Sequence, residues 1–127
     1  MPQPTIDQLA AERYVSLVTF RRNGKGVPTP IWIARAGDKL YAFTDGASAK
    51  MKRLRVTDRI QIAACDARGI VRGEFADGRA RKIDDPAIIR RALASLSQKY
   101  GWQMSVLSFF SRLSGRIKRR AYLEISL

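Results

Sequence analysis

The sequence of 127 residues contains no histidine and a single cysteine, Cys65. The lack of histidine excludes Ser-His-Asp and Cys-His catalysis, and with only one cysteine it also excludes the usual zinc ligand sets. A disulfide within the chain is excluded as well. No base is available to activate Cys65, so we expect a packed side chain there rather than a nucleophile. An enzyme of this composition needs a bound cofactor to carry its chemistry.

Long apolar runs and acidic residues are also scarce. No segment approaches the roughly 20 apolar residues of a membrane span, and the first residues lack the basic and apolar regions of a secretory signal. We therefore expect a cytoplasmic protein without a membrane partner. The 24 basic residues outnumber the 11 acidic ones, which gives a formal net charge of +13. This excess favours polyanions or a phosphorylated metabolite as partners, and a solvated basic surface explains part of it equally well.

The hydrophobic residues make up 46% of the chain, enough for one packed core, and the length suits one domain over residues 1–127. Thr5, Ser48 and Asp84 or Asp85 are placed to begin helices. The helices expected are a short opening one after Thr5, then residues 49–55, a long helix from Pro86 and residues 103–113. The strands expected are residues 15–22, 27–36, 40–44, 60–66, 70–83 with a bend at Asp77-Gly78, and 118–127.

Six short strands joined by hairpins, with helices between some of them, predict a mainly β fold: a small antiparallel barrel with inserted helices. The chain has no strand–helix–strand rhythm and no GxGxxG motif, which argues against a Rossmann domain. Pro28 and Pro30 cannot donate backbone hydrogen bonds, so their strand belongs at an edge or a bulge.

The segment Phe43-Thr44-Asp45-Gly46-Ala47-Ser48-Ala49-Lys50-Met51-Lys52-Arg53-Leu54 has the pattern of an anion site. A strand ends in a loop of small residues and a helix begins at Ser48, where free amides and the positive end of the helix dipole favour an anion. Lys50 and Arg53, three residues apart, add charge on one face. A phosphate is the expected guest. The alternative is a solvated basic helix.

Two other features are less specific when taken alone. The strand Pro28-Thr29-Pro30-Ile31-Trp32 can present an edge for a planar ring, but an ordinary edge strand protected from aggregation by proline explains it as well. Tyr100 and Trp102 follow a long helix, and we expect them in the core or at an interface.

The order of these segments resembles the pyridoxamine phosphate oxidase-like (PPOX class) split-barrel flavoprotein superfamily, and most closely its small members that depend on the deazaflavin F420. The resemblance covers nearly the whole chain, and the order and spacing of its motifs carry it. They are Tyr14-Val15-Ser16-Leu17-Val18-Thr19-Phe20-Arg21, Val27-Pro28-Thr29-Pro30-Ile31-Trp32, Ser48-Ala49-Lys50-Met51-Lys52-Arg53-Leu54, Cys65-Asp66-Ala67-Arg68-Gly69 and Lys99-Tyr100-Gly101-Trp102-Gln103.

The resemblance implies a six-stranded antiparallel split β-barrel of the FMN-binding type. By this resemblance, the strand of residues 27–32 contacts the ring of the cofactor. Phe43-Thr44 correspond to a Tyr-Thr pair of the family, and Ser48-Ala49-Lys50 correspond to its Ser-Arg-Lys phosphate motif. Lys52 or Arg53 would supply further charge. No catalytic side chain and no metal are implied. The cofactor-binding residues expected are Pro28, Thr29, Pro30, Ile31, Trp32, Phe43, Thr44, Ser48, Ala49, Lys50 and Arg53.

The sequence departs from the flavin-binding pattern in two places. Ala49 stands where the phosphate motif has arginine, and the strand of residues 27–32 lacks the oxidase's basic residue. Both departures favour F420 over FMN. The oxidase's basic, histidine-containing substrate signature near the C-terminus is missing too, so we do not expect oxidation of pyridoxamine phosphate. The resemblance further implies a homodimer with the cofactor in a groove between subunits, which Trp102 of one subunit would close over the other.

These observations lead to one main hypothesis and two others. The main one is an oxidoreductase that moves a hydride between reduced F420, or FMN, and a small organic acceptor. The second is a non-catalytic carrier that binds flavin, F420 or a tetrapyrrole on the same fold; for haem, the axial ligand would have to be Cys65, a methionine or a tyrosine. A nucleic-acid-binding barrel is disfavoured because the basic residues are scattered and the aromatic residues occupy apolar strand positions.

Overall fold

A computed structural model describes residues 3–127, without the side chains of residues 116 and 117. Within this part of the chain, seven strands, four α-helices and one 3-10 helix, η1, follow one another. The elements in chain order are α1 (Ile6–Ala10), β1 (Tyr14–Phe20), β2 (Gly26–Ile31), β3 (Ala34–Ala36), β4 (Lys39–Asp45), α2 (Ala49–Val56), β5 (Arg59–Cys65), β6 (Ala76–Ile83), α3 (Pro86–Tyr100), α4 (Trp102–Leu113), η1 (Arg116–Arg119) and β7 (Arg120–Ser126).

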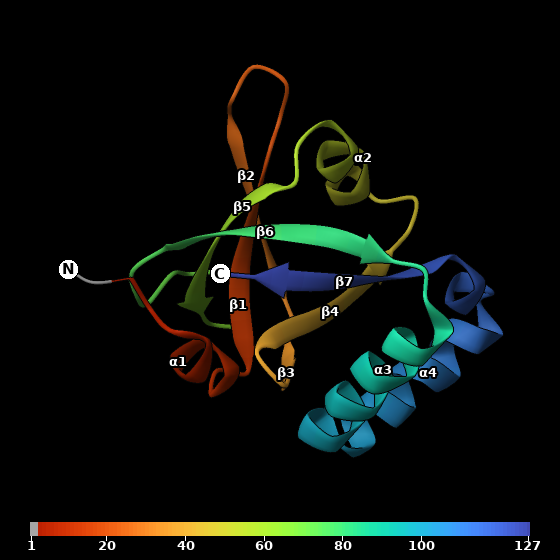
Figure 1. Cartoon of the computed structure of the whole chain (residues 1–127). Helices are drawn as coiled ribbons and strands as arrows, with labels where there is room; N and C mark the ends of the chain where they lie inside the picture. Colours follow the sequence, from red (N-terminus) through yellow and green to blue (C-terminus); the bar gives the residue numbers. More distant parts are fainter. Residues whose placement is uncertain (1–2) are drawn as a thin grey trace.

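All seven strands form one antiparallel sheet in the order β2-β1-β5-β6-β7-β4-β3 (Figure 1). The sheet curls without closing, because its two edge strands, β2 and β3, do not pair in the described structure. They are consecutive in the chain, and only Trp32 and Ile33 lie between them. The two edges are therefore near each other at one corner, which is the arrangement of a split barrel.

The corner at Trp32 and Ile33 adds one strand to the predicted number. Residues 27–36 were expected to form one strand, but the chain leaves the ladder at Trp32 and Ile33 and continues on the opposite edge of the sheet. The predicted six-stranded barrel is therefore a seven-stranded one. The position expected from the prolines is confirmed: Pro28 and Pro30 lie on an edge strand, opposite Val18 and Ser16 of β1.

The predicted strand of residues 70–83 is shorter in the structure, where β6 begins at Ala76, just before Asp77-Gly78. Both residues lie inside β6, where Gly78 pairs with Ile60 of β5. Residues 70–75, which were expected to begin the same strand, contribute one isolated bridge from Val71 to Cys65. Gly78 serves close packing: a Cβ atom there would lie 2.5 Å from the carbonyl oxygen of Ser126. The strand thus needs glycine because the end of β7 passes close to it.

The main core fills the inside of the curled sheet. It consists of apolar side chains from every strand except the short β3, together with Leu9 of α1, Met51 of α2 and Ile33 of the corner. Every residue of β1 after Tyr14 is buried, because the sheet packs on one side and helices and loops cover the other. In β7 buried and half-buried residues alternate, as the pleat of a strand requires.

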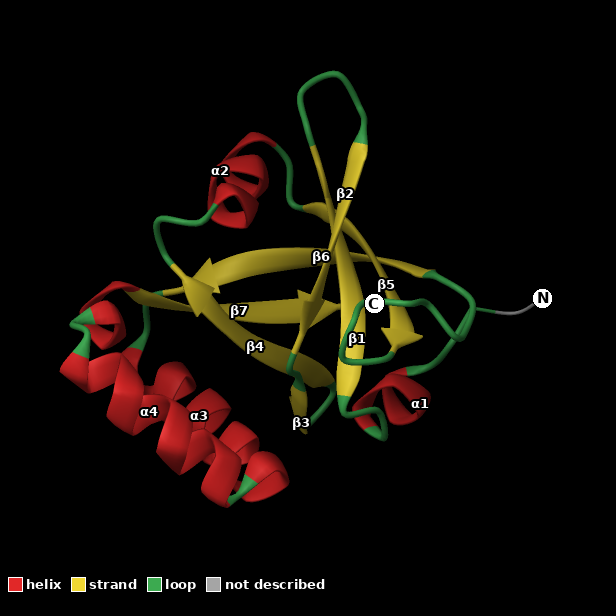
Figure 2. Cartoon of the chain, turned by 180° about the vertical axis from the view of Figure 1, so that it is seen from behind, coloured by secondary structure: helices red, strands yellow, loops and turns green. Residues whose placement is uncertain are grey.

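The helices α3 and α4 form a hairpin beside the barrel (Figure 2). Leu96 and Tyr100 of α3 pack with Ala34 of β3 and with Met104 of α4, so the hairpin covers the sheet at its β3–β4 edge. The predicted helix starts are confirmed at Thr5, which forms a capping box with Gln8, and at Asp85, which accepts from the backbone N–H of Ala87. No helix of the described chain has the length and apolar character needed to cross a membrane.

Candidate functional site

An open pocket of about 280 Å³ lies where the corner of the sheet, the end of β4 and the start of α2 meet. Its lining combines aromatic and apolar side chains with one cation, Lys50. The residues that line it are Tyr14, Pro30, Ile31, Trp32, Phe43, Thr44, Lys50, Ala67 and Leu107. No carboxylate is among them, and the described residues hold no group of three His, Cys, Asp or Glu side chains suited to a metal ion.

The pocket unites three segments that the sequence singled out separately. Six of the eleven expected cofactor-binding residues line it, and they come from β2 and its corner, from β4 and from α2. The other five do not line it: Pro28 and Thr29 lie further along β2, Ser48 and Ala49 lie at the start of α2, and Arg53 turns toward β1. The six that line it are Pro30, Ile31, Trp32, Phe43, Thr44 and Lys50.

Asp45 shapes the loop between β4 and α2. Its carboxylate accepts a hydrogen bond from the backbone N–H of Ala47 at 2.9 Å and pairs with Arg119 at 3.4 Å. The N–H of Gly46 donates to the carbonyl of Arg119 at 2.6 Å, and that same oxygen leaves no space for a Cβ at Gly46. The loop is therefore fixed against the start of β7, and it positions the start of α2 beside the pocket.

The start of α2 carries positive charge where a helix prefers negative charge. No acidic residue lies in its first turn, and Lys50 adds a cation to the positive end of the helix dipole. The Oγ of Ser48, at the N-cap position, is buried and has no hydrogen-bond partner in the described structure. The capping expected of Ser48 is thus not made. A cation, the free amides of a helix start and a buried hydroxyl donor without a partner form an environment suited to an anion.

Two arginines reinforce this charge. Burial, followed by the neighbouring charge of Arg53, lowers the pKa of Lys50, and burial followed by the charge of Arg21 lowers the pKa of Arg53. The Nε of Arg53 donates to Thr19 Oγ1 of β1 at 2.6 Å, which holds its guanidinium beside the sheet. None of the ion pairs among the described residues includes these three cations. A bound anion would relieve their mutual repulsion.

Trp32 forms one wall of the pocket, and Tyr100 supports it from behind. The two rings stack with centroids 4.3 Å apart and planes 6° from parallel, and Phe43 meets Trp32 edge-on at 6.3 Å. Trp32 is half-buried, whereas Tyr100 is 3% exposed. The indole therefore presents one face to the pocket while the other is covered by Tyr100.

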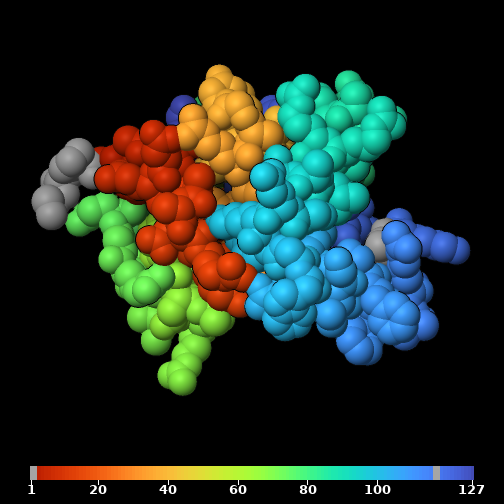
Figure 3. All heavy atoms as spheres, turned by 90° about the horizontal axis from the view of Figure 1, so that it is seen from below, coloured from red at the N-terminus to blue at the C-terminus, as the bar shows by residue number. Residues whose placement is uncertain are grey.

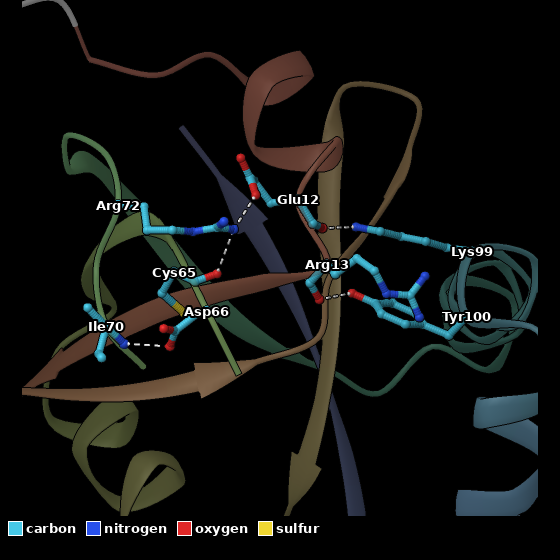
Figure 4. A network of polar contacts seen from close by, with 8 residues as sticks. All are labelled: Glu12, Arg13, Cys65, Asp66, Ile70, Arg72, Lys99 and Tyr100. Carbon is cyan, nitrogen blue, oxygen red and sulfur yellow. Dashed lines mark hydrogen bonds and ion pairs between the residues drawn. The ribbon is translucent and has the colours of Figure 1, made fainter. Parts of the chain in front are cut away.

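Tyr100 and its neighbour Lys99 join the end of α3 to the link between α1 and β1 (Figure 4), and they also bind the backbone of the corner. The Tyr100 hydroxyl donates to the carbonyl of Arg13 at 2.7 Å and accepts from the N–H of Ile33 at 3.1 Å. The ammonium of Lys99 donates to the carbonyls of Glu12 and Ile33, at 2.5 and 2.7 Å. Burial is the main cause that lowers the pKa of Lys99 to about 8 and raises the pKa of Tyr100 to about 12.

Three residues of the lining were not expected as site residues: Tyr14, Ala67 and Leu107. Tyr14 pairs with Cys65, so the start of β1 lies beside the end of β5 and the turn that contains Ala67. In that turn the Asp66 carboxylate accepts from the N–H of Ile70 (Figure 4) and from the N–H of Arg68. Tyr14 and Ala67 belong to segments that carry the family resemblance. That resemblance was the signal in the sequence that could have identified them as site residues. Nothing in the sequence pointed to Leu107.

Comparison with known proteins places this fold in a family. The family model for pyridoxamine 5'-phosphate oxidase matches residues 3–127. The chain belongs to the pyridoxamine 5'-phosphate oxidase family. No curated protein matches the sequence.

Solved structures share the fold at low sequence identity. The conserved hypothetical protein Rv2991 from Mycobacterium tuberculosis is 20% identical, with a TM-score of 0.68 over 93% of this chain and 74% of that one. An FAD-binding protein from Mesorhizobium loti is 18% identical, with a TM-score of 0.63 over 94% and 82%. The heme storage protein HutZ from Vibrio cholerae is 10% identical, with a TM-score of 0.69 over 91% and 82%. The fold thus occurs both in a flavin-binding protein and in a heme storage protein.

The support that Tyr100 gives to Trp32 can be tested without a ligand. The chain has two tryptophans, so in a Trp102→Phe background the fluorescence reports on Trp32 alone. Tyr100→Leu removes the stacked ring and opens the back of the indole to water, so we expect its emission to shift to longer wavelength. Tyr100→Phe keeps the stack and should leave the emission close to that of the background. Equal shifts in both variants would show that the hydroxyl, and not the stack, shields Trp32.

Proposed function

We propose that this protein is an oxidoreductase that binds reduced F420, or alternatively FMN, in the pocket beside Trp32 and Lys50 and passes a hydride to a small organic acceptor. The observation that carries the proposal is the meeting of a planar aromatic wall with an unpaired cationic helix start in one pocket. A flavin and a deazaflavin both consist of a planar ring system joined to an anionic tail. Family membership and the FAD-binding neighbour support a cofactor of this class.

The anionic end of the cofactor is assigned to the start of α2. Lys50 supplies the charge there, Ser48 the unused hydroxyl, and the backbone of Ala49 and Lys50 the free amides of the first helical turn. Arg53 adds a longer-range charge from its position on Thr19. Ala49 leaves the site without the arginine of the flavin pattern, which is why F420 stands before FMN in the proposal.

The ring end of the cofactor is assigned to β2 and the corner of the sheet. Pro30, Ile31 and Trp32 line the pocket, and Pro28 and Thr29 extend the same edge strand. An edge strand leaves backbone groups on its outer side unpaired, so they are available to the polar edge of a ring. Phe43 and Thr44 close the pocket from β4.

The hydride chemistry is supplied by the bound cofactor, and the chain's own residues bind and orient it. Phe43, Trp32 and Leu107 surround the ring end with apolar surface, which excludes water from the side they cover. No histidine and no carboxylate lines the pocket, so we assign no side chain as a general acid or base.

We further propose that the pocket is completed in a homodimer, with the cofactor in a groove between the subunits. The pocket is open in the single chain, and 127 residues leave little depth for a large cofactor. Trp102 is 73% exposed and does not line the pocket of its own chain. It is therefore the residue that we assign to the partner's groove.

The second candidate is a carrier that binds the same cofactor without turnover. It is favoured by the absence of histidine and carboxylate side chains from the lining, because a carrier needs no general acid or base. A tetrapyrrole is the less suitable cargo. Cys65, Met51 and Met104 are all nearly inaccessible, at 0, 3 and 2% exposure, and burial raises the pKa of the Cys65 thiol. Among the described lining residues, Tyr14 is left as the one axial ligand for haem.

Removal of the charge at Lys50 tests the anion site. We expect Lys50→Ala to weaken the binding of F420 by at least about tenfold, roughly 1.4 kcal/mol, because the lost cation faces the pocket. The measurement is a fluorescence titration of the purified protein, repeated with FMN. Arg55→Ala, a charge loss at the other end of the same helix, is the matched control and should change the dissociation constant little. Failure of the unmodified protein to bind either cofactor at tens of micromolar would refute the proposal.

The lowered pKa of Lys50 predicts a pH dependence of binding. Lys50 attracts an anion only while it is protonated, and burial with Arg53 makes it lose its proton at a lower pH than an ordinary lysine. Affinity should therefore fall as the pH rises, and the fall should begin at a lower pH than the loss of the proton from an ordinary lysine would give. Lys50→Arg keeps its charge over this range and should move the fall to higher pH. Identical alkaline profiles of the two proteins would remove Lys50 from the anion site.

Turnover distinguishes the oxidoreductase from the carrier. Mixing the loaded protein with reduced F420 or reduced FMN and a panel of enones should oxidise the cofactor, which is followed by absorbance. We expect at least one enone to be reduced faster than in a protein-free control. Cofactor binding without any acceleration across the panel would favour the carrier.

A further inference from the structure

A second cavity, of about 110 Å³, adjoins the cofactor pocket. The two spaces share three lining residues, Phe43, Thr44 and Leu107, and therefore lie next to each other. The residues that line only the second cavity are Asp45, Ser111 and Arg120. Its volume is several times the roughly 30 Å³ that one water molecule takes up in the liquid, which is enough for a small polar group. We call it the Arg120 cavity.

Three elements meet at the Arg120 cavity. Arg120 is the first residue of β7 and pairs with Asp45, the last residue of β4. Helix α4 reaches the ends of these strands because the α3–α4 hairpin packs along the β3–β4 edge, and in the space-filling view from below the hairpin forms one side of the molecule (Figure 3). Leu107 and Ser111 are four residues apart, so they lie on the same side of α4 and both line the cavity.

The guanidinium of Arg120 is held in place but not neutralised. Its Cζ lies 4.5 Å from the centroid of the Phe43 ring, and its two terminal nitrogens donate to the Oγ atoms of Ser108 and Ser111 at 3.4 and 3.3 Å. Both hydrogen bonds are long for an N–H donor. Arg120 is half-buried, and no ion pair among the described residues includes it. Phe43 and the two serines thus orient a planar cation that has no anion of its own.

The carboxylate of Asp45 lines the same cavity without pairing with this cation. It accepts from the N–H of Ala47 at 2.9 Å and pairs with Arg119 at 3.4 Å. The charge of Asp45 is therefore offset by the neighbouring arginine, and Arg120 leaves the cavity with an excess of one positive charge.

Arg120 is also within reach of a molecule that lies beside Trp32. The ring centroids of Trp32 and Phe43 are 6.3 Å apart, and a further 4.5 Å separates the Phe43 ring from the guanidinium. The anionic end of the cofactor is assigned to Lys50, which lines the cofactor pocket but not the Arg120 cavity. The two adjoining spaces thus have one cation each, which suits a reaction with two anionic ligands.

We propose that the Arg120 cavity binds a carboxylate of the hydride acceptor, and that the acceptor is a conjugated carbonyl compound with a free carboxylate. A guanidinium binds a carboxylate through two parallel N–H···O hydrogen bonds. Phe43 and Leu107, which line both spaces, offer apolar contact to the unsaturated part. An acceptor fixed at its carboxylate is also oriented for reaction. The inference rests on the proposed function, because it names the second ligand of the same site.

The reaction of such an acceptor needs no acidic or basic side chain. A hydride from the reduced cofactor forms a C–H bond at the β-carbon of the acceptor as the π bond of its C=C group breaks, and the α-carbon takes up a proton from water. The acceptor gains two electrons and two hydrogens, which the reduced cofactor loses, one of them as a proton to water. The carboxylate is unchanged, so the role of Arg120 is to bind and orient.

The test compares 3-benzoylacrylate, a conjugated ketone with a carboxylate, with its methyl ester. The protein is mixed with reduced F420 and each acceptor, and oxidation of the cofactor is followed by absorbance. We expect Arg120→Met to lower kcat/KM for the acid at least about tenfold, mainly through KM, and to change that for the ester little. Arg120→Lys keeps the charge but not the paired donors, so it should retain part of the preference for the acid. The control is Arg90→Met, which removes an exposed arginine of α3 and should behave like the unmodified protein.

Calorimetry separates this inference from the proposed function. The saturated acid 3-benzoylpropionate has no C=C bond to reduce, so its binding is measured without turnover, both with and without oxidised F420. We expect Arg120→Met to weaken this binding about tenfold. If the protein binds no cofactor, the proposed function fails, and a loss of 3-benzoylpropionate binding in Arg120→Met still supports the carboxylate site.

Three results would overturn the inference. Equal losses for the acid and the ester in Arg120→Met would show that Arg120 only supports the wall at Phe43. An unchanged ratio of the two rates would show that the cavity does not bind the carboxylate. Weaker binding of F420 to Arg120→Met, with unchanged binding of the deazaflavin that lacks the phosphate and tail, would assign Arg120 to the tail of the cofactor instead.

Discussion

The hydroxyl of Tyr100 and the ammonium of Lys99 hold the corner where the chain passes from one edge of the sheet to the other. Ile33 has lost its place in a strand ladder there, and its N–H and carbonyl are satisfied by these two side chains instead. A backbone group buried without a partner costs about 1–3 kcal/mol, so the corner depends on the end of α3 for its stability. The same contact places the Tyr100 ring on Trp32 and so defines one wall of the pocket. The contacts of Tyr100 and Lys99 thus stabilise both the corner of the fold and the wall of the candidate site.

The sequence predicted the strands best where local signals decide the structure. Alternating apolar residues, the prolines of β2 and the caps at Thr5 and Asp85 each act over a few residues, and the structure has these elements within a few residues of the expected positions. The corner at Trp32-Ile33 could not be predicted in this way. Its backbone leaves the ladder because Tyr100, 67 residues further along the chain, supplies the hydrogen bond. The need for glycine at residue 78 could not be predicted for the same reason, since a Cβ there would meet the distant carbonyl of Ser126.

The residues of the candidate site also fall into those that local signals predicted and those that tertiary packing places there. Lys50, Phe43 and Trp32 were expected from motifs, and the pocket brings them together. Arg53 was expected beside Lys50 on one face of the helix, but Thr19 of β1 draws its side chain away. Leu107 reaches the pocket from a helix that packs mainly on another helix, a tertiary arrangement that no local pattern encodes. The part of the site closest in sequence to a strand or helix end was predictable, and the part built by packing was not.

The distribution of charge separates structural cations from those left over for partners. Around the barrel, arginines pair with carboxylates, as in Arg72 with Glu12, Arg79 with Asp58 and Arg81 with Glu124. After residue 85 the chain has eight of its 24 basic residues but one of its 11 acidic ones. In the described part of the chain, cations without a carboxylate partner include Lys50 and Arg53 of α2 and Arg112 in the last turn of α4. The two cations of α2 are half-buried, and Lys50 lines the pocket, which suits the anionic tail of one small molecule. Arg112 is exposed to solvent instead, so the half-buried pair on α2 is the one whose mutual repulsion a bound anion would offset.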